Sequence, residues 1–174
     1  MDYITIESII PDAIVDLRYA GNDNIVGRPL YEKGYQARLA RAAAEALASA
    51  AESFRQIGYR IVIWDALRTK EAQQELRIVC SDDRYVAVAS NHVKGITVDL
   101  TLAAQEGAYL DMGTDHDEFN EKAHAAFDGL HEEQEKNRQL LSSVMTNAGF
   151  RQSPYEWWHF DFVADTEQKG RHET

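Results

Sequence analysis

The sequence predicts an α+β fold in which helices pack on a small antiparallel sheet. Two long segments carry apolar residues every three to four positions, as amphipathic helices do. Several shorter segments alternate in polarity or are rich in β-branched residues, as strands are. The helices and strands do not alternate strictly, which favours α+β over α/β. A length of 174 residues suits a single domain over residues 1–174 with one core.

In the first half of the chain, the pattern predicts three strands and one long helix. Residues 4–10 and 13–19 are expected to be short strands, and the turn-rich residues 21–29 (GNDNIVGRP) a loop. Residues 36–57 have helical spacing of apolar side chains and are followed by a glycine, so a helix is expected there. Residues 59–64 (YRIVIW) alternate and predict a strand.

In the second half, two helices and two strands are expected. A threonine can cap a helix over residues 70–79, and residues 81–89 are expected to form a loop or an edge segment. The apolar run 96–102 predicts a core strand. Residues 130–148 have one apolar face and precede a glycine, so they predict a second long helix, and residues 157–163 predict a final strand.

The charge of the chain argues against two classes of partner. The chain has 29 acidic and 18 basic residues, a formal net charge of −11, which disfavours binding to nucleic acid or to an anionic membrane surface. No basic and apolar signal peptide and no membrane-spanning run is found, so a soluble cytoplasmic protein is expected. The single cysteine, Cys80, allows neither an internal disulfide nor a pair of cysteine ligands.

The segment from Ser90 to Asp99 (SNHVKGITVD) runs from a loop into an apolar strand. Asp99 interrupts that strand, and a buried carboxylate must be paired, hydrogen-bonded or metal-bound. His92 lies at an odd offset, which would put the two side chains on opposite faces of an unbroken strand. Gly95 offers a bend or bulge that brings them to one site. On this segment alone, a structural aspartate and a loop histidine are an equal alternative.

A second segment places Glu156 and His159 beside the paired tryptophans Trp157 and Trp158. A catalytic zinc usually has three histidine or carboxylate ligands and keeps one position for water. With the upstream histidine and aspartate, His159 completes such a set, and Glu156 is left free to move a proton. The alternative is a buried ion pair beside a core histidine.

The two segments resemble motifs of the VanX-type D-alanyl-D-alanine dipeptidases, which are grouped with D,D-carboxypeptidases, lysostaphin-type peptidases and the hedgehog domain. SNHVKGITVD resembles Ser-x-His-x6-Asp, and EWWH resembles Glu-x-Trp-His. Further blocks follow the family's order: VDLRY at 15–19, WDALR at 64–68, DMGT at 111–114 and NAGF at 147–150. The resemblance implies a hedgehog-like α+β fold with a zinc site at the edge of its sheet.

The resemblance also implies a reaction, the zinc-dependent hydrolysis of a small dipeptide, D-alanyl-D-alanine. One Zn²⁺ per chain is implied at His92, Asp99 and His159, with Glu156 as the general acid/base.

Four further positions match residues around the family's substrate. Arg68 matches the arginine that stabilises the transition state, and its alternative is a structural ion pair with Asp65. Tyr19, Ser90 and Asp117 match positions that surround the dipeptide, and an acidic residue such as Asp117 suits a free ammonium. For each of these three, a structural hydrogen bond is an equal alternative.

Two departures from the family put the range of substrates in question. The 23 residues between Arg68 and His92 are fewer than in the VanX-type enzymes of resistance operons. His116 stands where the family usually has phenylalanine. A D,D-carboxypeptidase acting on longer peptidoglycan peptides therefore stays an alternative, as does, in a different class, a zinc-binding module without catalysis. Glu156 and Arg68 favour the enzyme.

Other histidines lack such support. His116, His124 and His131 lie among acidic residues and suggest a second metal site, but the run is better interpreted as a solvated helical face. His172 lies in a polar tail that is expected to fray. The biological role (glycopeptide resistance, cell-wall recycling or nutrition) and the oligomeric state do not follow from the sequence.

Overall fold

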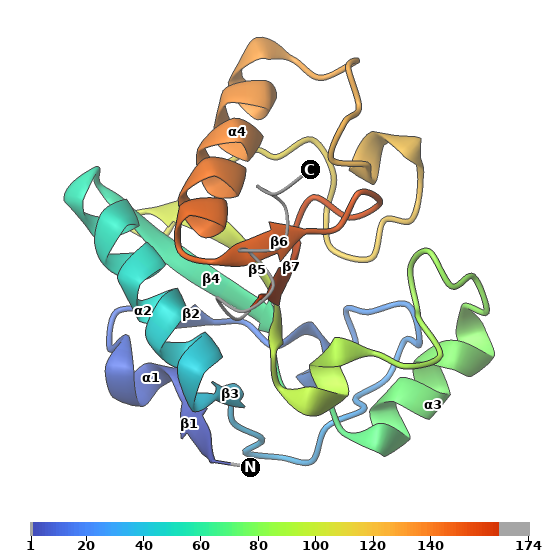
Figure 1. Ribbon diagram of the computed structural model, residues 1–174. Coiled ribbons are helices and arrows are strands. Elements are labelled where there is room, and N and C mark those ends of the chain that lie inside the picture. Colours follow the sequence, from blue (N-terminus) through green and yellow to red (C-terminus); the bar gives the residue numbers. More distant parts are fainter. Residues whose placement is uncertain (1, 164–174) are drawn as a thin grey trace, which may run out of the picture.

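A five-stranded sheet forms the centre of the computed structural model, which describes residues 2–163 (Figure 1). Neighbouring strands are antiparallel except β2 and β4, which are parallel because the chain crosses between them through helix α2. The α+β class is confirmed, but the sheet is mixed rather than purely antiparallel. Its order is β2-β4-β5-β7-β6, with bounds β2 Ile14–Val15, β4 Tyr59–Asp65, β5 Thr97–Ala104, β7 His159–Phe162 and β6 Phe150–Gln152.

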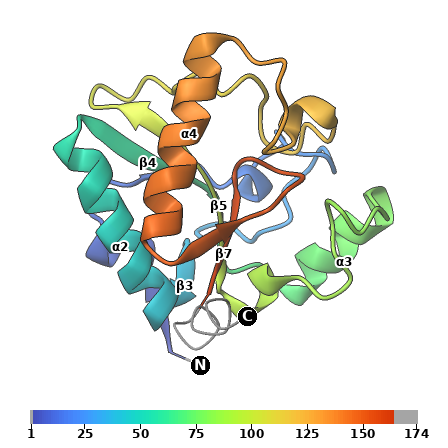
Figure 2. The same ribbon diagram turned by 45° about the horizontal axis from the view of Figure 1, so that its top comes forward.

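Helices α2 (Arg41–Gln56) and α4 (Glu132–Asn147) lie side by side over one face of the sheet (Figures 1 and 2). Their buried side chains, among them Leu47 and Leu141, join Leu100 of β5 in the main hydrophobic core. Side chains alternate between the two faces of a strand. The residues of β5 on either side of Leu100 therefore point to the opposite face, where the polar side chains gather.

Helix α3 (Lys70–Val79) lies apart from α2 and α4, at the right in Figure 2. Leu76 of α3 packs in a second apolar cluster with Tyr19, Tyr31 and Val86. The Oγ1 of Thr69 accepts a hydrogen bond from the backbone N–H of Ala72 at 3.1 Å, which confirms the predicted cap.

Two predicted elements near the N-terminus are each divided in two. The expected strand 4–10 is a short strand followed by one helical turn, and the expected helix 36–57 begins as a strand. The two strands, β1 and β3, pair antiparallel in a separate sheet. Leu39 fits a helical period and a core-facing strand position equally well. Only the pairing of its segment with the distant residues 3–5 determines that it forms a strand. The bounds are β1 Tyr3–Thr5, α1 Ile6–Ile9 and β3 Arg38–Ala40.

The remaining elements follow the predictions, with ends that are in part shorter and in part longer than expected. The expected strands 13–19 and 157–163 are confirmed in part, as β2 and β7, and β6 was not predicted because its three residues carry no period. Residues 21–29 and 81–89 contain no helix or strand. Short 3-10 helices cover Arg18–Ala20, Asn91–Lys94 and Glu121–Ala123.

Two expectations concern the ends of the chain and membranes. His172 and the tail expected to fray lie outside the described residues 2–163. Within those residues, no helix has the length and apolar character needed to cross a membrane.

Candidate active site

A row of three polar residues crosses the sheet on the face away from α2 and α4. Asp65 of β4 is paired with Asp99 of β5, and Asp99 is paired with His159 of β7. Directly paired residues point to the same face, so these three side chains meet. Both aspartates are buried in a region that is otherwise apolar, and such carboxylates need a charged or hydrogen-bonding partner.

His92 approaches the same row from a 3-10 helix rather than from the strand. The N–H of His92 donates to Ser90 Oγ at 3.2 Å, and Gly95 ends the helix in the left-handed region with φ 68°. A Cβ on residue 95 would lie 2.7 Å from the ring of Tyr3. The bend expected at Gly95 is therefore present, and it removes the objection that an odd offset separates His92 from Asp99.

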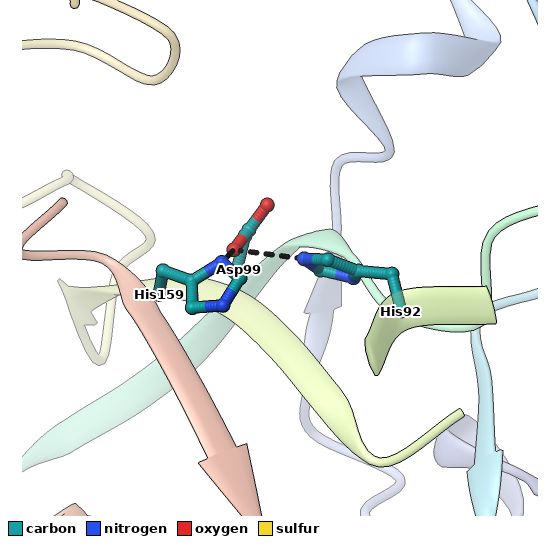
Figure 3. Close-up of side chains that lie close together, drawn as sticks. All are labelled: His92, Asp99 and His159. Atoms are coloured by element: carbon teal, nitrogen blue, oxygen red, sulfur yellow. Dashed lines mark ion pairs between the residues drawn. The ribbon is translucent and has the colours of Figure 1, made fainter. Parts of the chain in front are cut away.

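Three potential ligand atoms converge at the end of this row (Figure 3). Asp99 Oδ1 lies 3.3 Å from His92 Nε2 and 3.1 Å from His159 Nδ1. The ligand atoms of the three residues all lie within 4.8 Å of one another. His92 Nε2 and Asp99 Oδ1 are buried without a hydrogen-bond partner among the described residues. Two imidazoles and a carboxylate form a donor set that suits zinc, and a cation there would satisfy both unpartnered atoms.

The opposite nitrogen of each imidazole faces an oxygen atom. His92 Nδ1 lies 2.8 Å from the carbonyl oxygen of Ala66, and His159 Nε2 lies 3.6 Å from Asp161 Oδ1. Histidine ligands of metals usually donate their second N–H to an oxygen atom, which fixes the tautomer and the ring orientation. The distance at His92 is that of a hydrogen bond, and the contact at His159 is longer. The arrangement thus leaves His92 Nε2 and His159 Nδ1 free to bind a metal ion.

Arg68 is buried beside the three residues and is held rigidly. Its Nε and Nη2 donate to Asp65 Oδ2 at 2.9 and 2.8 Å, and its Nη1 donates to Gln73 Oε1 at 2.7 Å. Nη2 also lies 3.8 Å from Asp99 Oδ2. Burial opposes the charge, but Asp65 holds the pKa of Arg68 well above its usual value. The ion pair considered for Arg68 exists, and it fixes a permanent cation next to the ligand carboxylate.

Glu156 lies in the turn before β7, with its carboxylate 3.8 Å from His159 Nδ1. Burial raises the pKa of Glu156 to about 8; His159 opposes this shift, while Asp99 adds to it. A carboxyl group with a pKa near neutrality can both accept and return a proton. The position next to a ligand histidine and the raised pKa suit a general acid/base.

Asp117 lies on the other side of Asp99 in an unusual backbone conformation. Its φ of 59° falls in the left-handed region. Its Oδ2 accepts a hydrogen bond from Tyr19 at 2.7 Å, and its Oδ1 lies 3.5 Å from His116 Nε2. Burial raises the pKa of Asp117, while His116 opposes the shift. Tyr19 and Asp117, two of the positions expected to surround the dipeptide, are thus in contact with each other.

One cavity of about 300 Å³ brings the expected residues together. The loop 83–91 and the turn before β7 form much of its wall. All eight residues singled out in the sequence line it: Tyr19, Arg68, Ser90, His92, Asp99, Asp117, Glu156 and His159.

The second metal site considered for His116, His124 and His131 is not formed. His124 Nε2 lies 3.1 Å from the hydroxyl of Tyr85, and His131 caps α4. His116 instead joins the main site. Within residues 2–163, the only cluster of three or more histidine, cysteine or acidic residues with metal-binding geometry is the one described above.

The sequence as a whole matches a family model described as D-ala-D-ala dipeptidase over residues 1–172. The chain belongs to the D-Ala-D-Ala dipeptidase family. The D-alanyl-D-alanine dipeptidase of Escherichia coli (strain K12) is 37% identical over 163 residues, which cover 92% of this chain and 84% of the relative. Those of Enterococcus faecalis (strain ATCC 700802 / V583) and Enterococcus faecium are 30% and 31% identical, and cover 85% and 89% of this chain and 85% and 88% of the relatives.

A solved structure was also matched. The D,D-pentapeptidase VanY from a VanB-type vancomycin resistance cassette, in complex with Zn(II), has a TM-score of 0.49 and 18% identity, covering 80% of this chain and 81% of that chain.

The motifs of the dipeptidase family predicted the residues that line the cavity, but they did not predict all the residues that hold those side chains in place. Asp161 lies two residues after His159 on the same strand face, a spacing that could have identified it. Gln73, which holds Arg68, lies on another element and leaves no local pattern. Asp65 had been considered only as an ion-pair partner, but it also lies 3.4 Å from His92 Nδ1.

Proposed function

We propose that this protein hydrolyses D-alanyl-D-alanine, using one zinc ion held by His92, Asp99 and His159. The observation that carries the proposal is the convergence of three ligand atoms in a member of the D-Ala-D-Ala dipeptidase family, two of them buried and without a hydrogen-bond partner among residues 2–163. The proposal takes residues 1–174 as one domain, since the family match runs over almost all of them.

The donor set supports a catalytic role for the metal. Two histidine nitrogens and one carboxylate leave coordination positions open, which is typical of catalytic rather than structural zinc. When bound there, zinc would supply a Lewis acid that lowers the pKa of water and polarises the scissile carbonyl. The hydrogen bond from His92 to Ala66 and the contact of His159 with Asp161 hold both imidazoles in the orientation this requires.

Glu156 moves the proton. It takes a proton from the attacking water and delivers it to the nitrogen of the leaving D-alanine, so that the amine departs in neutral form. Burial raises the pKa of Glu156 to about 8 in the metal-free protein, and a carboxyl group whose pKa lies near the working pH can both accept and return a proton.

Arg68 stabilises the negative charge that develops on the carbonyl oxygen. Its guanidinium is already aligned by Asp65 and Gln73, so little reorganisation is needed during the reaction. Asp117, with Tyr19 hydrogen-bonded to it, accepts the free ammonium of the dipeptide, and Ser90 lines the same cavity, where it can hydrogen-bond the substrate.

The experiment compares three substrates in the zinc-loaded protein and in a Glu156→Gln variant. We expect D-alanine release from D-Ala-D-Ala, much slower release from N-acetyl-D-Ala-D-Ala, and no hydrolysis of L-Ala-L-Ala to L-alanine. The variant should bind zinc yet lose activity. Preference for the acylated peptide would instead favour a D,D-carboxypeptidase, and absence of hydrolysis with all three would contradict the proposed function.

A further inference from the structure

A second polar row crosses the sheet beside the row that holds the metal ligands. Thr97 of β5 is paired with Asp161 of β7, and Asp161 is paired with Arg151 of β6. Asp161 lies two residues from His159 along β7, so both rows point to the same face. Arg151 is therefore a cation on the metal-binding face, at the edge strand of the sheet.

Arg151 differs from the other arginines that line the cavity. Arg68 is buried and donates to Asp65 and Gln73, and Arg84 donates to both carboxylate oxygens of Asp82. Arg151 makes one ion pair within residues 2–163, a long contact of 3.7 Å to Asp161 Oδ2, and its side chain is 56% exposed. Its guanidinium thus keeps hydrogen-bond donors available for a ligand.

Asp161 is fixed by hydrogen bonds from residues other than Arg151, so its position does not depend on the conformation of Arg151. Its Oδ1 accepts from Thr97 Oγ1 at 2.5 Å and from Asn91 Nδ2 at 3.3 Å. Asp161 thus anchors the guanidinium at the rim of the cavity through its remaining oxygen, while the long Arg151 side chain retains freedom to reach inward.

The cavity therefore has an acidic residue, Asp117, on one side of the metal ligands and a basic residue, Arg151, on the other. Asp99 Oδ2 faces His116, which contacts Asp117, whereas Asp99 Oδ1 faces His159, which leads to Arg151 through Asp161. Successive contacts of 3.5, 3.2, 3.1, 3.6 and 3.7 Å connect Asp117, His116, Asp99, His159, Asp161 and Arg151 in this order.

The polarity of a free dipeptide matches this order of charges, since its ammonium and its carboxylate lie on opposite sides of the scissile carbonyl. With the ammonium at Asp117 and the scissile carbonyl at the three ligands, the carboxylate points toward the row of Arg151.

We propose that Arg151 binds the terminal carboxylate of the substrate and thereby selects zwitterionic dipeptides. The inference rests on the proposed dipeptidase function and adds a residue to it. A guanidinium and a carboxylate form strong charge-assisted hydrogen bonds. The other two guanidinium groups that line the cavity, those of Arg68 and Arg84, each already contact a carboxylate oxygen at 2.8 Å or less.

The test measures kcat/KM for D-Ala-D-Ala and for D-alanyl-D-alaninamide, which lacks the carboxylate charge. Wild type should prefer the free acid. In Arg151→Gln, kcat/KM for the free acid should fall about tenfold, chiefly through a higher KM, while kcat/KM for the amide stays unchanged. A tenfold fall corresponds to about 1.4 kcal/mol. Arg151→Lys should retain part of the preference. Arg84→Gln, the matched control, should keep all of it.

The outcomes separate the two claims. An inactive wild type contradicts the proposed function itself. An active wild type whose preference persists in Arg151→Gln, or disappears in Arg84→Gln instead, overturns the role of Arg151. Activity on the amide reports whether Arg151→Gln is folded. If Arg151→Gln is inactive on both substrates, Arg151→Lys decides: an active Arg151→Lys without any preference for the free acid overturns the role of Arg151 as well.

Discussion

The imidazole Nε2 of His116 lies 3.2 Å from Oδ2 of Asp99, on the side of the carboxylate away from the two ligand histidines. Burial alone would raise the pKa of Asp99, but His92 and the hydrogen bonds from the surrounding histidines hold it well below its usual value. Asp99 is therefore an ionised carboxylate with one oxygen fixed by His116 and the other directed at the metal position.

Replacing His116 by phenylalanine should weaken zinc binding. His116→Phe keeps an aromatic ring against Trp64 and Trp158 but removes the donor to Asp99. Loss of such a supporting hydrogen bond typically costs 10- to 100-fold in metal affinity, and we expect about tenfold. Competition with a chromogenic chelator measures it. His124→Phe, the same substitution outside the cavity, should leave the affinity unchanged, and equal affinities in both variants would contradict the role of His116.

Gly95→Ala should destabilise the protein and disturb the site. The residue has φ 68°, and an added Cβ would meet the ring of Tyr3 at 2.7 Å. We expect a loss of about 2 kcal/mol in the free energy of unfolding, combining backbone strain and steric overlap. Gly107→Ala is the matched control, since Gly107 has φ 96° but an open surrounding. Chemical denaturation distinguishes them, and equal losses would show that the contact with Tyr3 does not matter.

The raised pKa of Glu156 predicts how stability changes with pH in the metal-free protein. The carboxyl has a pKa of about 8 in the folded state against 4.5 ordinarily, chiefly through burial. Between these values the folded state binds the proton more tightly than the unfolded state does, so this group's contribution is complete below 4.5 and is lost as pH rises through 8. Glu156→Gln lacks it.

Urea denaturation of the metal-free wild type and of Glu156→Gln at about pH 5 and about pH 8 checks this sign. The variant should gain stability relative to wild type at the higher pH. A difference that stays constant between the two pH values would mean that the carboxyl group of Glu156 is not shifted.

Arg68→Lys should preserve charge but lose activity. Lysine cannot donate at once to Asp65, to Gln73 and to a developing oxyanion in the geometry that the guanidinium holds. We expect kcat/KM on D-Ala-D-Ala to fall about 100-fold, mostly in kcat, because the interaction forms in the transition state. Steady-state kinetics measure the fall. Arg84→Lys, which alters another arginine of the same cavity, should have kinetics within a few-fold of wild type.

Local patterns predicted the parts of the fold that are governed by local rules. The cap at Thr69, the strand beginning at Tyr59 and the helical face ending before Gly149 all follow from nearby residues. The divided elements at Ile6 and Leu39 do not, because β1 and β3 exist only through pairing with each other across the chain.

The candidate site shows the same division. Asp99 was visible because it interrupts an apolar strand, and Glu156 and His159 because they flank paired tryptophans. Asp161 was not singled out although it lies only two residues after His159, and Arg151 was not because its position beside the site depends on the register between β6 and β7. Strand register is a tertiary property that a single sequence does not encode in any local pattern.

The zinc dependence of D-Ala-D-Ala hydrolysis tests the central claim most directly. The protein is stripped of metal, then titrated with zinc while D-alanine release is followed. We predict no activity without metal, full activity at one zinc per chain, and no recovery in an Asp99→Asn variant at the same zinc concentrations. Hydrolysis by the metal-free protein, or full recovery in Asp99→Asn, would contradict a zinc site formed by His92, Asp99 and His159.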